Sequence, residues 1–487
     1  MKATSMRINI LKYAAIGLGL ACFAMTYTSC TLPQSLTVHT KESKKTPANY
    51  TYYTSQDSVN TGKINWKEFF TDPNLAALID TALGRNQELN IMRQEITIRQ
   101  NEIRARKGEY LPFVGFGADA GIEKTAKYTP MGAVEEQLST EKGSFSDPLG
   151  MYGIGLNASW ELDVWRKLRN AKKSAVYRYL GSVEGRNFAV TNLVREIANS
   201  YYELLALDAQ LQILVQNIEI QTNALEIVRM EKIAARVTEL AVRKFEAEVL
   251  KNRSRIYYIR QSIIETENRI NFLVGRYPQP IPRTTETFLK MQPDSIHAGL
   301  PSQLLLNRPD IRQAENNLAA SKIDVTVARA QFYPSLRITA GVGYQAFKAQ
   351  YLINPNSLLY GIAGDLMAPL VNRNALKAQY YSASATQIQN VYDYERTLLN
   401  AYIEVANQVS NISNLKQSFE LKERQVQALT QSITISTGLF RNARADYMEV
   451  LMTQRDALEA RFELVDTKLQ QMNAMVNIYQ ALGGGWN

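Results

Sequence analysis

The chain has 487 residues, of which 45% are hydrophobic and 21% are charged, a composition that is typical of folded proteins and argues against intrinsic disorder. Its formal net charge of +9 is spread thinly, without a dense block of Lys and Arg, so nucleic-acid binding is not expected. Two cysteines and two histidines are too few for a disulfide framework or a cluster of metal ligands.

The first 30 residues have the features of a bacterial export signal. Three basic residues precede an apolar stretch from Tyr13 to Met25, which has the length of a signal-peptide core. Small residues stand directly before Cys30, as in lipoprotein processing, so Cys30 is predicted to become the lipidated first residue. Tyr27 occupies the position where the usual motif has Leu. The alternative is an ordinary signal peptide that leaves a free thiol.

An internal duplication follows. Tyr110–Phe113 aligns with Phe332–Ser335 at an offset of 222 (332 minus 110), whereas Tyr152–Ile154 aligns with Tyr360–Ile362 at an offset of 208 (360 minus 152). The offset then stays at 208 as far as the C-terminus. One connection is therefore 14 residues longer in the first half (222 minus 208), and length differences of this kind occur in surface loops.

Apolar residues alternate with polar or small residues from Tyr152 to Glu161 and from Leu336 to Gln345, and less regularly in Val114–Ala120 and Tyr360–Ala368. Alternation over about ten residues is typical of strands in a membrane β-barrel. Four strands cannot close a barrel, so several chains are expected to share one. Hairpins in a water-soluble sheet are the alternative.

Long helices account for most of the remaining chain. Apolar residues recur every seven positions from Val190 to Leu225, a period that indicates coiled-coil packing. We predict one long helix from about Asn170 to Ala235 and its counterpart from Asn374 to Asn442. Each is followed by a return helix that ends at Gly275 or at Gly483.

Several segments resemble the TolC-like outer-membrane factors, and with Cys30 the chain is most similar to their lipidated OprM/NodT-type efflux outlet branch. The resemblance extends from about Trp66 to Trp486. The segments that carry it are Leu300–Leu305 with Arg308–Arg312, Ala328–Leu336, Ser159–Trp165 and Tyr479–Trp486.

The resemblance implies a mixed α/β, mainly α fold. A duplicated helical-hairpin and β-hairpin repeat would form, as a homotrimer, a 12-stranded outer-membrane β-barrel on a long periplasmic α-helical barrel. The implied organisation is a signal peptide (1–29), a lipidated N-terminal segment of an equatorial belt (30–70), a first repeat (71–275) with a β-hairpin at about 112–163 and a helical tip near 235, an equatorial linker (276–300), a second repeat (301–483) with a β-hairpin at about 335–369 and a tip near 443, and a C-terminal tail (484–487).

The function implied is that of an outer-membrane exit duct, which passively conducts small molecules and is not an enzyme. Its expected partners are a periplasmic adaptor (membrane fusion protein), an inner-membrane pump of the RND type and outer-membrane lipid. No cofactor is expected beyond a covalent lipid on Cys30. Two alternatives are the outlet of a type I protein-secretion system, which has the same fold, and a non-conducting envelope coiled-coil lipoprotein.

The helical tips carry the candidate site residues. Family members commonly have Gly-Leu at the turn, whereas this chain has Ala235-Arg236 in one repeat and Ala443-Arg444 in the other. Because the change occurs twice, we expect these residues to dock the adaptor. The alternative is a pair of solvated charges at helix ends.

Family constrictions use acidic residues just after the second turn. Glu449 matches the first of these positions, while Met452 replaces the second, usually Asp. Three copies of Glu449 would form an acidic ring that attracts cations. Asp446 and Tyr447 are further candidates for the gate, with Arg444 as a contact. The alternative for Glu449 is an exposed carboxylate on a helix.

Overall fold

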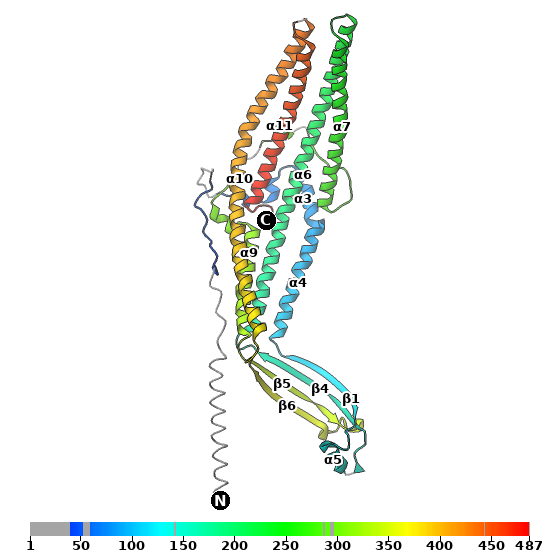
Figure 1. The fold of residues 1–487 in the computed structure, drawn as a ribbon, viewed down its shortest axis with the longest axis vertical. Coiled ribbons are helices and arrows are strands. Elements are labelled where there is room, and N and C mark those ends of the chain that lie inside the picture. The colour runs from blue at the N-terminus through cyan, green and yellow to red at the C-terminus, as the bar shows by residue number, and fades with distance from the viewer. Residues whose placement is uncertain are drawn as a thin grey trace. The chain divides into compact units, whose positions relative to one another are not determined.

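A computed structural model describes residues 39–51, 59–140, 143–285, 288–292, 297–442 and 444–486. The chain divides into two compact units (Figure 1). The strand unit comprises Met1–Lys41, Thr97–Tyr179 and Asn316–Tyr392, and the helix unit comprises Glu42–Ile96, Leu180–Glu315 and Asp393–Asn487. Each unit therefore combines segments of both sequence repeats.

The two halves of the chain present their main elements in the same order: helix, strand, strand, long helix and return helix. The long helices have 67 and 68 residues, and the return helices have 36 and 35. These lengths agree with the predicted duplication and with the predicted helical segments. The main elements are α3 (Pro73–Arg85), α4 (Gln87–Glu109), β1 (Phe113–Glu123), β4 (Leu149–Leu162), α6 (Lys167–Ile233) and α7 (Glu239–Val274) in the first half, and α8 (Leu304–Asn307), α9 (Pro309–Ala330), β5 (Ser335–Ala346), β6 (Leu358–Met367), α10 (Asn374–Arg441) and α11 (Tyr447–Ala481) in the second.

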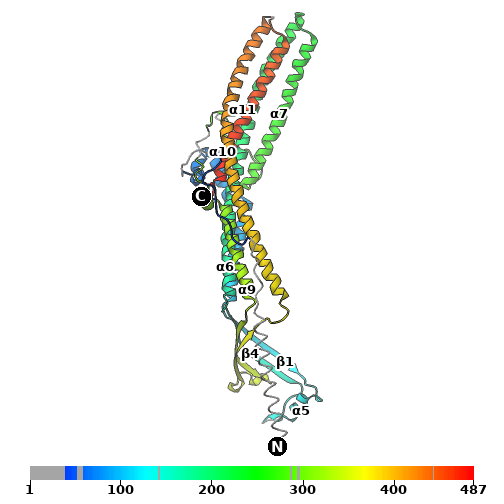
Figure 2. The same ribbon diagram turned by 60° about the vertical axis from the view of Figure 1, so that its left-hand side comes forward.

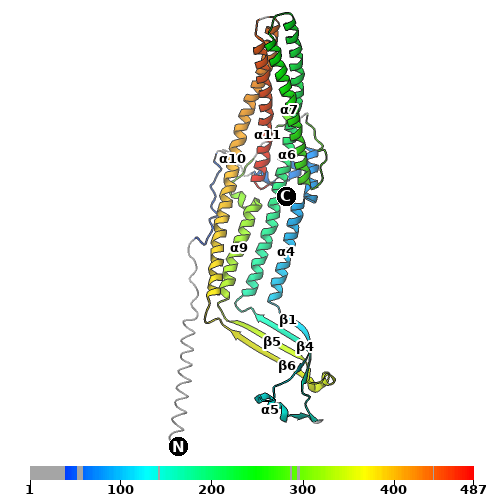
Figure 3. The ribbon, with the colours of Figure 1, turned by 45° about the vertical axis from the view of Figure 1, so that its right-hand side comes forward.

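The strands form one antiparallel sheet in the order β1-β4-β5-β6 (Figures 1 and 3). Each half supplies a hairpin, and the hairpins join through β4 and β5, where Ile154 pairs with Tyr344 and Leu162 with Leu336. All four strands occur where the alternation predicted them. At the outer edges, β1 and β6 each have one strand neighbour in the sheet of the described residues.

The two faces of this sheet differ in chemistry, because successive side chains of a strand point to opposite faces. Val114, Leu156 and Val342 belong to the apolar face. The other face carries a row of small or polar residues, Gly115, Asn157, Gly341 and Gly361, which are paired across the four strands. The alternation read from the sequence therefore corresponds to two separate surfaces.

The longer connection of the first half, between β1 and β4, is more regular than the loop that we predicted. It contains a short helix, α5 (Pro130–Gln137), and the small strands β2 (Ser139–Thr140) and β3 (Gly143–Ser144). Thr129 caps α5, since its hydroxyl accepts a hydrogen bond of 3.1 Å from the Gly132 N–H, and proline at the first helical position favours helix initiation.

The helix unit is built around a core that the heptad pattern of α6 supplies. Ile197 and Leu204 are fully buried in one cluster with Leu75 of α3, Ile270 of α7 and Val476 of α11. The apolar positions repeated every seven residues thus form a packed face, as the period predicted. None of the helices in the described part of the chain combines the length and hydropathy needed to cross a membrane.

A buried arginine fixes the start of the second repeat in this unit. Arg308 lies just before α9, and its guanidinium contacts Asp310 at 2.6 Å, Glu404 of α10 at 2.7 Å and the Ala481 carbonyl of α11 at 3.0 Å. Burial alone would lower the pKa of Arg308, but the hydrogen bonds and charges of Asp310 and Glu404 outweigh it and raise the pKa. One side chain therefore links three helices.

We expect Arg308→Met to lower the stability of the helix unit by about 3 kcal/mol, because it leaves Asp310 and Glu404 without their buried partner. Thermal unfolding in detergent, followed by circular dichroism, measures the change. Arg396→Met is the matched control: Arg396 is exposed and pairs with Asp393 within one helix, so its loss should cost less than about 1 kcal/mol. Equal melting temperatures for the two variants would contradict this role of Arg308.

Candidate functional site: the helical tips and the polar face of the sheet

The first tip joins α6 to α7 through a turn with a left-handed residue. The Arg236 N–H donates to the Glu231 carbonyl and the Ala235 N–H to the Lys232 carbonyl, each at 2.9 Å, which is the Schellman arrangement. Ala235 has a φ of 55°, a conformation that favours glycine. The backbone therefore explains why glycine is the usual family residue at this position.

The second tip, between α10 and α11, closes in the same way. The Arg444 N–H donates to the Leu439 carbonyl at 2.9 Å, and these residues align with Arg236 and Glu231 at the offset of 208. Ala443 lies outside the described residues. The two tips therefore share the same backbone hydrogen bond at equivalent positions of the two repeats.

The two tip arginines are exposed. Arg236 also lies 3.5 Å from the Glu231 carboxylate, at the end of its own helix. The exposure of both side chains makes them available to another protein, as docking requires.

Charged residues of the first tip form a network that the sequence analysis did not identify. Lys232 of α6 binds Glu239 of α7, which lies 2.8 Å from Arg243, and Arg243 lies 2.9 Å from Glu246. Arg229 of α6 reaches Glu246 at 3.9 Å. The hydrogen bond from Lys232, with the added positive charge of Arg243, lowers the pKa of Glu239. Ion pairs thus link α6 to α7 at their common end.

The second tip is uncharged at the positions that align with this network. Its residues instead form apolar contacts with the first hairpin: Phe440, Tyr447 and Leu451 pack against a cluster that includes Val242 and Phe245. Tyr447, predicted to belong to the gate, therefore packs within its own chain. Residues Glu226, Arg229, Glu231, Lys232, Glu239, Arg243 and Glu246 of the first tip align at the offset of 208 with Thr434, Thr437, Leu439, Phe440, Tyr447, Leu451 and Gln454.

The predicted acidic residues of the gate lie on the surface at the start of α11. Asp446 occupies the N-cap position and its carbonyl accepts the Glu449 N–H at 3.1 Å. Both residues are exposed, as is Met452. A carboxylate in the first turn is also favourable for the helix itself, because it lies near the positive end of the helix dipole.

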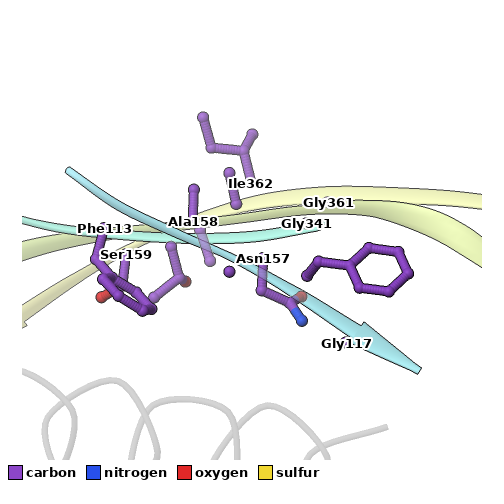
Figure 4. Close-up of a pocket in the computed structure, with 13 residues that line it drawn as sticks. Phe113, Gly117, Asn157, Ala158, Ser159, Gly341, Gly361 and Ile362 are labelled. Atoms are coloured by element: carbon purple, nitrogen blue, oxygen red, sulfur yellow. The ribbon is translucent and has the colours of Figure 1, made fainter. Parts of the chain in front are cut away.

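A cavity lies at the row of glycines in the sheet, and residues of both faces line it. Its volume is about 670 Å³, and it is lined by Phe113, Gly115, Asn157, Gly341 and Gly361, among others (Figure 4). A methyl group on Gly341 would lie 3.2 Å from the Asn157 side-chain oxygen. Only Asn157, Ser159 and Thr339 contribute polar side chains to its lining, and the remaining lining residues are glycine, alanine or larger apolar residues.

Two remaining points concern metal ligands and the lipidation of Cys30. The described residues contain no group of three or more His, Cys, Asp or Glu side chains that could hold a metal ion. Cys30, the predicted lipidation site, lies outside the described residues.

Comparison with known proteins identifies the family. The model of the outer membrane efflux protein family matches residues 78–276 and 300–484, which together are most of the sequence. The chain belongs to this family. It is therefore the outer membrane channel of a tripartite efflux system and not an enzyme, as the resemblance implied.

The similarity to characterised members extends over nearly the whole chain. The cation efflux system protein CusC of Escherichia coli O6:H1 (strain CFT073) is 26% identical over 473 residues, which are 96% of this chain and 98% of CusC. The pyoverdine export outer membrane protein OpmQ of Pseudomonas putida (strain KT2440) is 29% identical over 426 residues, 86% of this chain and 88% of OpmQ.

A solved structure confirms the fold. The crystal structure of the open state of the MtrE outer membrane channel of Neisseria gonorrhoeae has a TM-score of 0.81 to this chain, at 23% identity. It covers 94% of this chain and 98% of that one. The predicted TolC-like fold, with its long helices and four-stranded sheet, is therefore correct.

Proposed function

We propose that three copies of this chain form one exit duct, in which each copy supplies four strands of a shared 12-stranded barrel. The observation that carries the proposal is the pair of outer edges in the sheet of the described residues, at β1 and β6. These strands have 11 and 10 residues, and nearly all of these are exposed. Unpaired backbone groups are too costly to leave in lipid, so another chain must cover both edges.

The direction of the strands permits this closure. Neighbouring strands are antiparallel throughout the sheet, so β6 of one copy and β1 of the next are antiparallel as well. The apolar face, with exposed Val114, Phe116, Tyr360 and Ile362, suits the lipid side, and the glycine-rich face suits the lumen. Two copies would give eight strands; the family resemblance favours three.

The N-terminal segment supports a lipid anchor near the same barrel. The His39 ring stacks on Tyr392 of α10 at 4.6 Å, and the Thr40 carbonyl accepts a hydrogen bond from Gln387 at 3.2 Å. The nine residues back to Cys30 (39 minus 30) can span at most about 30 Å. The part of α10 from Asn374, next to the end of β6, to Tyr392 covers 18 steps along the helix (392 minus 374) and spans about 27 Å. A lipid on Cys30 can therefore reach the base of the strands.

Native mass in mild detergent, before and after heating, tests the shared barrel. We expect a mass on the order of 155 kDa plus detergent, collapsing to one chain on heating, since each processed chain is slightly lighter than the 55.0 kDa of the full sequence. Intact-chain mass should also show the loss of residues 1–29 and the gain of acyl groups.

Three results would contradict the proposal. A mass of two chains would mean an eight-stranded barrel. A single chain would favour the envelope coiled-coil lipoprotein, because the sheet edges would then need no partner. An intact chain mass without acyl groups would reject the lipid on Cys30.

We propose that the duct receives small molecules from a periplasmic adaptor and an inner-membrane pump, with Arg236 and Arg444 at the adaptor contact. The relatives are named for different cargoes, cations and pyoverdine among them. This variety on one fold supports a passive duct whose cargo is set by its partners.

Arg236→Glu combined with Arg444→Glu should weaken adaptor pull-down by at least tenfold. The two substitutions together change the charge at these positions from +2 to −2, which would repel the surface that the arginines attract. The matched control, Arg104→Glu with Lys107→Glu on α4, makes the same change at exposed residues of the strand unit and should bind normally. Undiminished pull-down by the tip variant would leave both arginines as solvated helix-end charges.

Glu449→Ala should reduce cation selectivity in planar bilayers, because a ring of carboxylates at a constriction attracts cations. The reversal potential under a salt gradient measures it. Glu88→Ala is the control, since Glu88 is also an exposed carboxylate in the first turn of a helix, α4. A reversal potential identical to that of the unmodified channel would reject the acidic ring.

A further inference from the structure

We propose that the connection between β1 and β4 carries a binding site for a small organic cation with an apolar body. We call this connection, residues 124–148, the α5 lobe. It lies at the ends of the strands opposite to those that join α4 and α6 (Figures 1 and 3). All of the lining residues lie between Glu123 and Leu149, so one chain forms the whole site.

The α5 lobe is longer than its hairpin requires. It has 25 residues (149 minus 123, minus 1), whereas the connection between β5 and β6 has 11 (358 minus 346, minus 1). Glu123 is paired with Leu149, so the strands of the hairpin stay in register up to both ends of the lobe. Connections that a rigid scaffold holds in place commonly carry binding residues.

Contacts within the lobe hold α5 against the segment that precedes it. The Thr125 hydroxyl donates a hydrogen bond of 3.1 Å to the Glu135 carboxylate. A methyl group on Gly132 would lie 2.2 Å from the Ala126 carbonyl oxygen, so glycine is what allows α5 to pack this closely on the turn before it. A binding site that is held in shape before its ligand arrives costs less entropy to fill.

One side of the lobe is apolar and uncovered. Met131 and Val134 of α5 and the following Leu138 have the spacing of one helical face, and they are 63%, 53% and 50% exposed. With Phe145 and Leu149 they line a cavity of about 440 Å³, a volume within the range of small-molecule sites. The apolar body of a ligand would remove this surface from water, which is favourable.

An aromatic ring adds to the same wall of the cavity. Phe145 is half-buried and packs edge-on against Phe347 of the β5–β6 connection, with 5.0 Å between the ring centroids. The Phe347 ring lies 5.7 Å from that of Tyr351. The second hairpin thus supports the lobe through its aromatic residues, and the face of a phenyl ring attracts cations.

The charges at the cavity select a cation. The charged lining residues are Glu123, Lys127, Glu135, Glu136 and Asp147. Glu136 pairs with Lys127, and Asp147 pairs with Lys124, each at 3.6 Å. Within the described part of the chain, Glu123 and Glu135 have no basic partner, so two negative charges remain at the cavity.

A metal ion fits this site less well than an organic cation. Among the described residues there is no group of three or more His, Cys, Asp or Glu side chains that could hold a metal. The apolar wall would also gain no contact from a bare ion. Apolar surface beside uncompensated carboxylates is complementary to a molecule that is both apolar and positively charged.

Tetraphenylphosphonium is the probe that we choose, because it is a cation with an aromatic body, and tetraphenylborate is an anion of the same shape. Equilibrium dialysis measures their binding to the full-length channel in lipid nanodiscs, and binding to empty nanodiscs is subtracted. We expect saturable binding of about one tetraphenylphosphonium per chain, at least tenfold tighter than that of tetraphenylborate. High salt should weaken it, since exposed charges are screened.

Glu123→Gln combined with Glu135→Gln should weaken tetraphenylphosphonium binding at least fivefold. The amide oxygen of Gln can still accept the hydrogen bond from Thr125, so the lobe should keep its shape. The matched control, Glu88→Gln with Glu420→Gln, removes two exposed carboxylates of the helix unit and should bind as the unmodified channel does. A second variant, Val134→Ser with Leu138→Ser, removes apolar surface at exposed positions and should also weaken binding at least fivefold.

The remaining outcomes would overturn the site. Equal binding of the two ions, or undiminished binding by the Glu123→Gln, Glu135→Gln variant, would mean that the carboxylates do not select the ligand. Absence of saturable binding would mean that lipid or another subunit covers the apolar face of the lobe. Each of these results leaves the proposed duct intact. A native mass of one chain would reject the proposed trimer and leave this site standing, since one chain forms it.

Discussion

Backbone N–H and C=O groups along the outer sides of β1 and β6 impose the constraint on which this structure depends. In the described part of a single chain, the sheet ends at these two strands. A hydrogen-bonding group in hydrocarbon has no water to pair with, so a sheet at the level of the membrane must close on itself. Four strands are too few for that closure. Because their number is even, β6 of one copy and β1 of another would pair in the antiparallel direction. The strand count of the chain therefore supports the proposed assembly from several copies.

The helices meet an equivalent constraint through packing rather than hydrogen bonding. In the second repeat the apolar face of α11 is covered by α6 of the same chain, whereas in the first repeat the face of α7 remains open. Leu250 and Tyr257 of α7 are largely exposed, whereas Leu458 and Val465, at the equivalent positions of α11, are buried. In the described residues, the sheet thus leaves the outer edges of β1 and β6 uncovered, and the helix unit leaves an apolar face of α7 exposed.

Features that depend on neighbours in the sequence were predictable, and features that depend on distant segments were not. The strands at Tyr152–Glu161 and Leu336–Gln345 follow from local alternation, and α6 follows from its heptads. The pairing of β4 with β5 joins residues nearly two hundred positions apart, which no local pattern specifies. The ion pair between Lys232 and Glu239 could not be predicted without the geometry of the turn that brings α6 and α7 together. Thr129 and Pro130 did signal the start of α5, and the sequence analysis overlooked them.

The unlike tips of the two repeats have a consequence for how such a protein can change over time. One tip is held by ion pairs across α6 and α7, and the other rests on its neighbour through Phe440, Tyr447 and Leu451. In a channel made from six identical hairpins, each substitution would appear in all six hairpins and change the contacts of all of them. Here a substitution reaches only every second hairpin of the proposed ring. Selection can therefore adjust the charged set and the apolar set separately.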